Sequence, residues 1–213
     1  MSTRFIINLI LIGVVALFGL LQSQKNSRAF QLLTILILYT FLSEITSRIL
    51  ANYYGIAFPV YHIYVFVGLV FNAFIYQNLL SFNRGIKLFF GLMTICFVLL
   101  SLINTLFIQT IFTFPSYGIM LHGLQAILFA LIVYQKMLKT PSNTPLSKQA
   151  VFWLNTGNFV FYGLTFIVFA LYNFYYQTAT MSSWVYWLIW CGNIFLYSCY
   201  FMAIYLNSKS TNA

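Results

Sequence analysis

The chain has 213 residues, of which 62% are hydrophobic, 21% are aromatic and only 5% are charged. Soluble domains carry about 25% charged residues, so this composition excludes an ordinary soluble fold and predicts a polytopic membrane protein. The net charge of +9 comes from ten Lys and Arg residues against a single Glu. These basic residues lie in short gaps between apolar runs, without a basic aromatic patch, and we therefore expect no nucleic-acid partner.

Seven apolar segments reach the length of about 20 residues that a helix needs to cross a bilayer. They fall, in chain order, at 4–22, 30–51, 58–80, 86–108, 114–136, 149–172 and 184–206. The sequence therefore predicts an all-α fold, with one seven-helix transmembrane domain over 1–206 and a polar cytoplasmic tail over 207–213. The lipid bilayer is the first partner that this prediction implies.

The distribution of Lys and Arg predicts how the bundle is oriented, because cytoplasmic loops carry an excess of these residues. The second, fourth and sixth gaps between the segments carry no charge. We therefore expect the amino terminus outside and the carboxyl terminus in the cytoplasm, in a multi-pass protein of a bacterial cytoplasmic (inner) membrane. The residues behind this prediction are Lys25, Arg28, Arg84, Lys87, Lys136, Lys139, Lys148 and Lys209.

The only acidic side chain, Glu44, lies inside the apolar segment 30–51, and Arg48 follows it by one helical turn. A carboxylate at membrane depth is costly and usually faces the interior of the bundle. We expect the two residues to form an ion pair within one helix, and replacement of Glu44 by Gln to destabilise the protein by leaving Arg48 unpaired. Thr40, Ser43 and Ser47 continue the same polar stripe.

Both histidines fall in the same outer layer as Glu44 when the helices are oriented this way. Because an unperturbed histidine titrates near neutral pH, His122 is a candidate proton sensor. Hydrogen bonding between helices is the simpler explanation for such polar residues, and no catalytic residue is assigned. The candidate ligand-binding residues are Glu44, Arg48, His122, Gln125, His62, Tyr61, Asn72, Trp190 and Asn193.

We expect no metal or other cofactor. Glu44, His62 and His122 are of the types that bind catalytic zinc, but their spacings match no zinc motif and Arg48 would repel a cation. Ligation of a haem by the two histidines is disfavoured because, within the outer layer, they differ in depth by about two helical turns. A retinal chromophore needs a lysine in the last helix, and 184–206 contains none.

Two short motifs resemble parts of the CAAX-type membrane protease family: Glu44-x-x-x-Arg48, and then Phe58-x-x-x-His62. The resemblance implies a Glu and a His that activate water. This chain departs from the family pattern, since Ser43 stands where the family has a first glutamate. The family's later motif, His followed four residues on by Asn or Asp, would map onto His122. Ala126 stands there in place of the Asn or Asp.

In outline the whole chain is similar to uncharacterised bacterial seven-helix proteins that act as sensor modules beside or fused to signalling kinases. The residues that carry this likeness are Glu44-x-x-x-Arg48 and the run from Lys148 to Trp153. It implies a receptor or sensor that binds a small ligand or a proton in an outer polar pocket and signals through a cytoplasmic partner. An integral-membrane hydrolase or transferase acting on lipid or peptide, a transporter, and an assembly subunit remain alternatives. Homo-oligomerisation stays open.

Overall fold

The computed structural model describes residues 3–80, 82–175 and 183–210, and every regular element within these ranges is helical. Three short turns connect the long helices: η1 (Ser23–Lys25), the π-helical turn η2 (Asn104–Ile108) and η3 (Leu146–Lys148). The long helices are α1 (Thr3–Leu21), α2 (Arg28–Tyr54), α3 (Phe58–Leu79), α4 (Arg84–Ile103), α5 (Ser116–Lys139), α6 (Ala150–Tyr175) and α7 (Ser183–Ser210).

Seven helices in the described part of the chain are long and apolar enough to cross a membrane. This confirms the predicted all-α architecture and the number of candidate spans. Several bounds differ by a few residues; the predicted segment 86–108, for example, divides into α4 and the π-helical turn η2. α2 continues past residue 51 to Tyr54 and ends at Gly55, whose φ of 69° is the left-handed conformation that favours glycine at a helix end. α5 begins at Ser116, so Phe114 belongs to the preceding connection.

The predicted boundary between the bundle and a polar tail needs correction, because α7 continues through Ser210. Asn207 and Ser208 are buried. The Ser27 hydroxyl donates to Asn207 Oδ1 at 3.2 Å, and Asn207 Nδ2 donates to Asn26 Oδ1 at 3.3 Å. Polar partners in the α1–α2 turn thus let polar residues continue the helix. Residues 211–213, and most of the predicted gap 173–183, lie outside the described residues.

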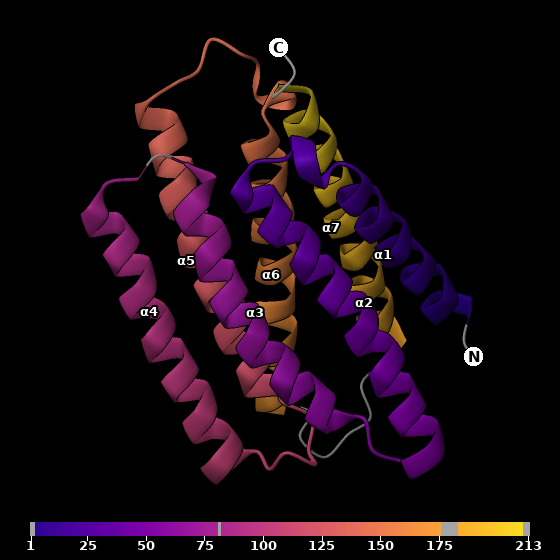
Figure 1. Ribbon diagram of the computed structural model, residues 1–213. Helices are drawn as coiled ribbons and strands as arrows, with labels where there is room; N and C mark the ends of the chain where they lie inside the picture. The colour runs from indigo at the N-terminus through magenta and orange to yellow at the C-terminus, as the bar shows by residue number, and fades with distance from the viewer. Residues whose placement is uncertain (1–2, 81, 176–182, 211–213) are drawn as a thin grey trace.

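The helices run alternately up and down, which separates two ends of the bundle (Figure 1). At the carboxyl-terminal end, where α7 finishes, lie the α1–α2, α3–α4 and α5–α6 connections. At the amino-terminal end, where α1 begins, lie the α2–α3 and α4–α5 connections. The eight basic residues used to predict the orientation therefore gather at the carboxyl-terminal end.

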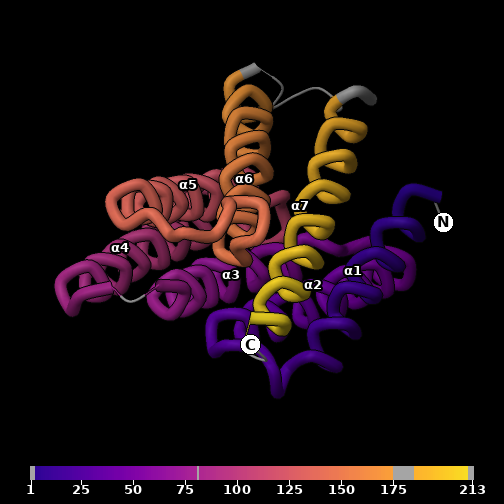
Figure 2. The backbone as a smooth tube through the Cα atoms, turned by 90° about the horizontal axis from the view of Figure 1, so that it is seen from above, coloured from indigo at the N-terminus to yellow at the C-terminus, as the bar shows by residue number. Residues whose placement is uncertain are grey.

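The tightest aromatic packing lies in the half of the bundle next to the carboxyl-terminal end. Tyr76, Phe90 and Phe129 are fully buried, and their ring centroids are 4.6 to 6.4 Å apart. Figure 2, which looks along the bundle, shows α4 at its edge, beside α3 and α5. The packed half fills the interior of the bundle on the carboxyl-terminal side of the site described next.

Candidate functional site

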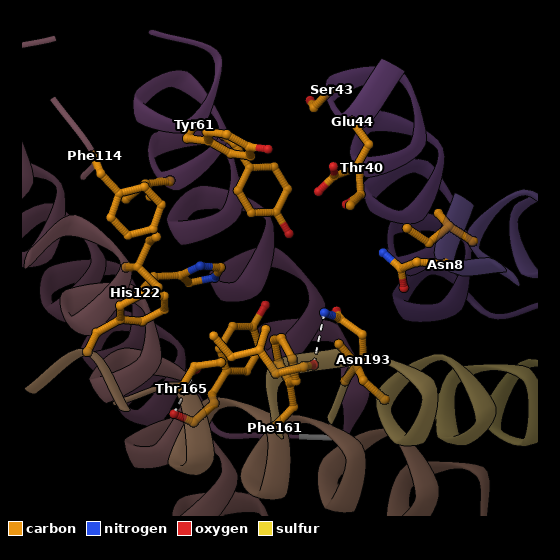
Figure 3. Close-up of a pocket in the computed structure, with 18 of the residues that line it drawn as sticks. Asn8, Thr40, Ser43, Glu44, Tyr61, Phe114, His122, Phe161, Thr165 and Asn193 are labelled. Atoms are coloured by element: carbon orange, nitrogen blue, oxygen red, sulfur yellow. Dashed lines mark hydrogen bonds between the residues drawn. The ribbon is translucent and has the colours of Figure 1, made fainter. Parts of the chain in front are cut away.

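A cavity of about 660 Å³ occupies the amino-terminal half of the bundle (Figure 3). Its lining comes from α1, α2, α3, α5, α6 and α7 and from the α4–α5 connection, and no described residue of α4 belongs to it. Most lining side chains are aromatic or aliphatic, with a few polar groups among them. Pockets of about 300–1,000 Å³ with this composition are typical of small-molecule sites. The polar non-aromatic groups, apart from the histidine described below, are Asn8, Thr40, Ser43, Glu44, Thr165 and Asn193.

A cluster of aromatic rings lines the cavity near the amino-terminal end. Phe114, from the α4–α5 connection, lies 6.1 Å from Phe58 and 6.5 Å from Tyr61, measured between ring centroids. On its other side Phe114 lies 5.4 Å from Phe169 and 6.5 Å from Tyr172. All five rings line the cavity. Through Phe114 these rings connect α3 to α6.

Glu44 lines the cavity, but the ion pair predicted for it is wrong. No Lys or Arg nitrogen lies within ion-pair distance of its carboxylate among the described residues, which include all ten basic side chains. The Arg48 guanidinium instead lies over the ring of Phe5 in α1, 5.5 Å from its centroid, and Arg48 Nε is buried without a hydrogen-bond partner. Residues four apart lie only about 40° apart around a helix, so helix geometry alone would allow the pair, and it is the contact with Phe5 that directs Arg48 away from Glu44. One faces the cavity and the other faces α1.

His122 lines the cavity from α5, on the wall opposite Glu44 (Figure 3). Asn72 Nδ2 donates to His122 Nε2 at 3.1 Å, which leaves the proton of the neutral ring on Nδ1. The ring packs against Tyr162, with centroids 4.8 Å apart. Gly68 of α3 gives the imidazole its space, because a Cβ there would lie 2.6 Å from His122 Cε1. The orientation of the imidazole ring is therefore fixed by α3, through Asn72 and Gly68.

Two more predicted site residues, Tyr61 and Asn193, also line the cavity. The Tyr61 hydroxyl lies 3.1 Å from Ser47 Oγ, so α2 and α3 are joined beside Glu44. Asn193 Nδ2 donates to the Ile189 carbonyl one turn earlier in α7, at 3.2 Å. Of the nine predicted residues, Glu44, Tyr61, His122 and Asn193 thus share one cavity, and Asn72 supports it through His122.

His62 does not line the cavity. Its side chain is 2% exposed, and both ring nitrogens are engaged: Nδ1 lies 3.0 Å from Thr105 Oγ1, and Nε2 lies 3.0 Å from the Thr113 carbonyl oxygen. These partners belong to η2 and to the α4–α5 connection that carries Phe114. The residue fastens this connection to α3, and the geometry assigns it a structural contact.

Gln125 and Trp190 also face away from the cavity. Gln125 Nε2 donates to Thr94 Oγ1 at 2.8 Å, which links α5 to α4, and its Oε1 is buried without a partner. Trp190 Nε1 donates to the carbonyl of Arg4 at 3.1 Å, which attaches the start of α1 to α7. Both residues hold helices together, as in the simpler explanation of the polar faces.

The structure does not assemble the zinc-like set of residues. Among the residues that are described, no three His, Cys, Asp or Glu side chains lie close enough together to hold a metal ion. Glu44 and His122 line the cavity, while His62 is bound to Thr105 and Thr113. Of the two motifs that resemble CAAX-type proteases, Glu44 and Phe58 line the cavity, whereas Arg48 and His62 do not.

Sequence reasoning missed Asn8, which lines the cavity from α1 and whose Oδ1 is buried without a hydrogen-bond partner. A signal was available. Asn8 is the one polar residue between Phe5 and Gly13 in a segment that is otherwise strongly apolar. A polar side chain at membrane depth usually faces the interior.

A chain of hydrogen bonds, here called the floor network, lies about one helical turn from the cavity, on its carboxyl-terminal side. It consists of Tyr76, Asn155, Asn158 and Tyr200. The Tyr200 hydroxyl donates to Asn158 Oδ1 at 2.6 Å, Asn158 Nδ2 donates to the Tyr76 hydroxyl at 3.1 Å, and that hydroxyl donates to Asn155 Oδ1 at 3.2 Å. Asn155 Nδ2 then donates to the Ala130 carbonyl at 3.0 Å. The network ties α3, α5, α6 and α7 together.

Comparisons with models of protein families, with curated proteins and with solved structures found no match to this chain. The class of the protein therefore follows from its own fold and site. It is an all-helical protein with seven candidate membrane spans among its described residues and one cavity of small-molecule size between six of them.

Proposed function

We propose that this chain is a receptor-like sensor of a bacterial cytoplasmic membrane. It binds a small ligand, or a proton, in the cavity and signals through a cytoplasmic partner. The observation that carries the proposal is the cavity of about 660 Å³ that Glu44 lines without an ion-pair partner, opposite His122. A partly buried carboxylate without a partner is costly. Groups kept in that state are characteristic of functional sites.

The proposed orientation places the amino-terminal end, and with it the cavity, outside the cell. It is supported by the eight basic residues at the opposite end. Single cysteines introduced at Asn52 and at Ser142, in a variant whose three native cysteines are replaced by Ala, test this orientation. An impermeant maleimide is expected to label Asn52→Cys but not Ser142→Cys in intact cells. The reverse pattern contradicts the proposed orientation.

The proposed signal passes from α2 to the carboxyl-terminal end. α1 and α2 supply one wall of the cavity but no member of the floor network, and in this proposal they shift relative to the helices that the network holds. Their connecting turn contacts the end of α7 through Asn26, Ser27 and Asn207. A ligand acts on this contact if it binds one packing of α1 and α2 more tightly than the other, because equal affinity shifts nothing.

An enzyme is the second candidate, and the specific observation in its favour is that Glu44 and His122 line the same cavity. A carboxylate and an imidazole can act as general acid and base. The substrate would be a lipid or a peptide small enough for the cavity, in a hydrolase or transferase reaction. Sensor and enzyme then differ in whether the bound molecule is chemically changed.

Native mass spectrometry of the protein, released from its membrane in a mild detergent, tests the ligand cavity. We expect a discrete small mass on the wild-type chain. Thr165→Phe adds a ring to the cavity wall and should abolish this adduct. Ile167→Phe is the matched control on the same helix, because Ile167 is 59% exposed and outside the lining. An adduct that both variants retain, or a chain that carries only bulk lipid, contradicts a ligand in this cavity.

The sensor and the enzyme are separated by what the retained molecule does. For a sensor, removal of that molecule should change amide hydrogen exchange in the turn 22–27, at the far end of the bundle from the cavity. For an enzyme, the molecule should be converted over time by the wild type but not by Glu44→Gln. Unchanged exchange together with turnover rejects the sensor in favour of the enzyme.

A further inference from the structure

We propose that the cavity is selective for an organic cation, with Glu44 as the counter-ion of the ligand's ammonium group. This inference rests on the proposed function, since it names the chemical class of the molecule in the same cavity. It follows from three independent features of the lining: its charge, its aromatic character and its unpaired hydrogen-bond acceptors.

The charge of the cavity is complementary to a cation. Its described lining contains one carboxylate, Glu44, and no Lys or Arg. Arg48, one turn away, is the basic residue that could have neutralised Glu44 from the same helix, but it lies over Phe5. Apart from the tyrosines, the lining has one further titratable side chain, His122. It lies on the opposite wall and is hydrogen-bonded to Asn72. A ligand cation therefore supplies the charge that the protein itself does not provide.

The aromatic lining favours the same sign of charge. Tyr61, Tyr64, Phe161, Tyr186 and Tyr197 all line the cavity, and the face of each ring carries negative electrostatic potential. Ammonium groups bind between such faces, as in the aromatic cages that recognise quaternary ammonium ligands. An anion among these rings would be repelled by their negative faces, and the described lining has no Lys or Arg to neutralise it.

The unpaired acceptors indicate where the ammonium group binds. Asn8, Thr40 and Glu44 lie on one side of the cavity in Figure 3. Asn8 Oδ1 is buried without a donor, and a flip of this amide turns the oxygen toward the cavity. A primary ammonium has three N–H donors and no acceptor. Glu44 and Asn8 therefore offer it acceptors on two neighbouring helices.

Isothermal titration of the purified chain in an uncharged maltoside detergent tests the charge preference. The probes share a phenyl ring and differ in charge: phenethylamine, 2-phenylethanol and phenylacetate. We expect the amine to bind about tenfold or more tightly than the alcohol, and the carboxylate to bind most weakly. Equal binding of the amine and the alcohol, or stronger binding of phenylacetate, overturns the inference.

Two substitutions test whether the preference for the amine over the alcohol depends on Glu44. Glu44→Gln should bring the amine to the affinity of the alcohol while the affinity of the alcohol stays unchanged. Asn8→Asp adds a second carboxylate beside the first and should raise the affinity for the amine. Asn8→Asp tests the same preference by a gain of affinity, which a folding defect does not produce. A variant that still binds the alcohol but gains no affinity for the amine contradicts the inference, and Ile167→Phe serves as the control that changes nothing.

An ammonium group could come from a free amine or from the ethanolamine headgroup of a phospholipid, and competition distinguishes the two. Dihexanoyl phosphatidylethanolamine should displace phenethylamine if the headgroup enters the cavity, and dihexanoyl phosphatidylglycerol should not. Failure of both lipids to compete assigns the site to a free amine. If the cavity retains a discrete native molecule but all three phenyl probes bind equally, the cation inference fails and the ligand cavity stands.

Discussion

Gly68 of α3 and the imidazole of His122 in α5 are in direct contact, since a Cβ on the glycine would lie 2.6 Å from His122 Cε1. This approach lets the ring lie against the α3 backbone, where Asn72, one turn further along α3, binds its Nε2. The histidine that faces the cavity is thus positioned by a residue that has no side chain and by an amide outside the lining. Both come from the neighbouring helix.

Gly68→Ala should therefore displace the His122 ring and weaken its hydrogen bond to Asn72. The added methyl overpacks the contact, and overpacking typically costs about 1–3 kcal/mol. We expect a lower midpoint of thermal unfolding in detergent and a reduced retention of the native adduct in mass spectrometry.

Gly163→Ala is the matched control for this substitution. A Cβ at Gly163 of α6 has no heavy atom within 4 Å, so it adds no clash, and alanine favours a helix over glycine by roughly 0.5–1 kcal/mol. Its unfolding midpoint should equal or exceed that of the wild type. If both variants are equally destabilised, the contact between Gly68 and His122 is not the cause.

Glu44→Gln should leave the stability of the protein unchanged or raise it. The sequence alone predicts the opposite, on the assumption that Glu44 pairs with Arg48. Because the structure has no such pair, the neutral amide removes a costly carboxylate and breaks no ion pair. Thermal unfolding of the ligand-free protein checks this. A large fall in the midpoint would show that the carboxylate has a stabilising partner after all.

His62→Gln should destabilise the α4–α5 connection without emptying the cavity. The substitution removes the two ring contacts, to Thr105 and to the Thr113 carbonyl, and a buried group left unsatisfied costs about 1–3 kcal/mol. Faster amide hydrogen exchange across residues 104–115, with the native adduct still bound, is the expected result. Loss of the adduct with unchanged exchange would instead indicate that His62 contacts the ligand.

Asn158→Ala should show that the floor network acts as a unit. Asn158 accepts from Tyr200 and donates to Tyr76, and such hydrogen bonds average about 0.6 kcal/mol each within a bilayer. A double-mutant cycle with Tyr200→Phe measures the coupling, since residues in one network are not additive. Strict additivity of the two free-energy changes would contradict the hydrogen bond between them.

The helices could be predicted from the sequence because composition alone determines them. Each of the seven segments is apolar over about 20 residues, and the long polar interruptions fall between segments. The end of α7 could not be predicted in this way. Asn207 reads as solvent-exposed tail until Ser27 and Asn26, about 180 residues earlier, are seen to bind it.

The site could be predicted only in part, for a related reason. Depth along a helix follows from the sequence, so Glu44 and His122 are expected in one layer of the bundle, and both line the cavity. The direction in which each side chain points depends on its contacts with neighbouring helices, and the sequence does not show which helices are neighbours. His62 lies in the first turns of α3, as expected, but Thr105 and Thr113 hold its ring away from the cavity. Phe5 draws Arg48 toward α1 in the same way.

The participation of both the first and the last helix in the cavity has a consequence for biogenesis. Asn8 comes from α1 and Asn193 from α7, and Trp190 attaches α7 to the carbonyl of Arg4. A chain still on the ribosome, with six helices inserted, lacks one wall of the site. A ligand of the proposed kind would therefore be held only after α7 has packed against α1, and it would selectively stabilise chains that have reached this stage.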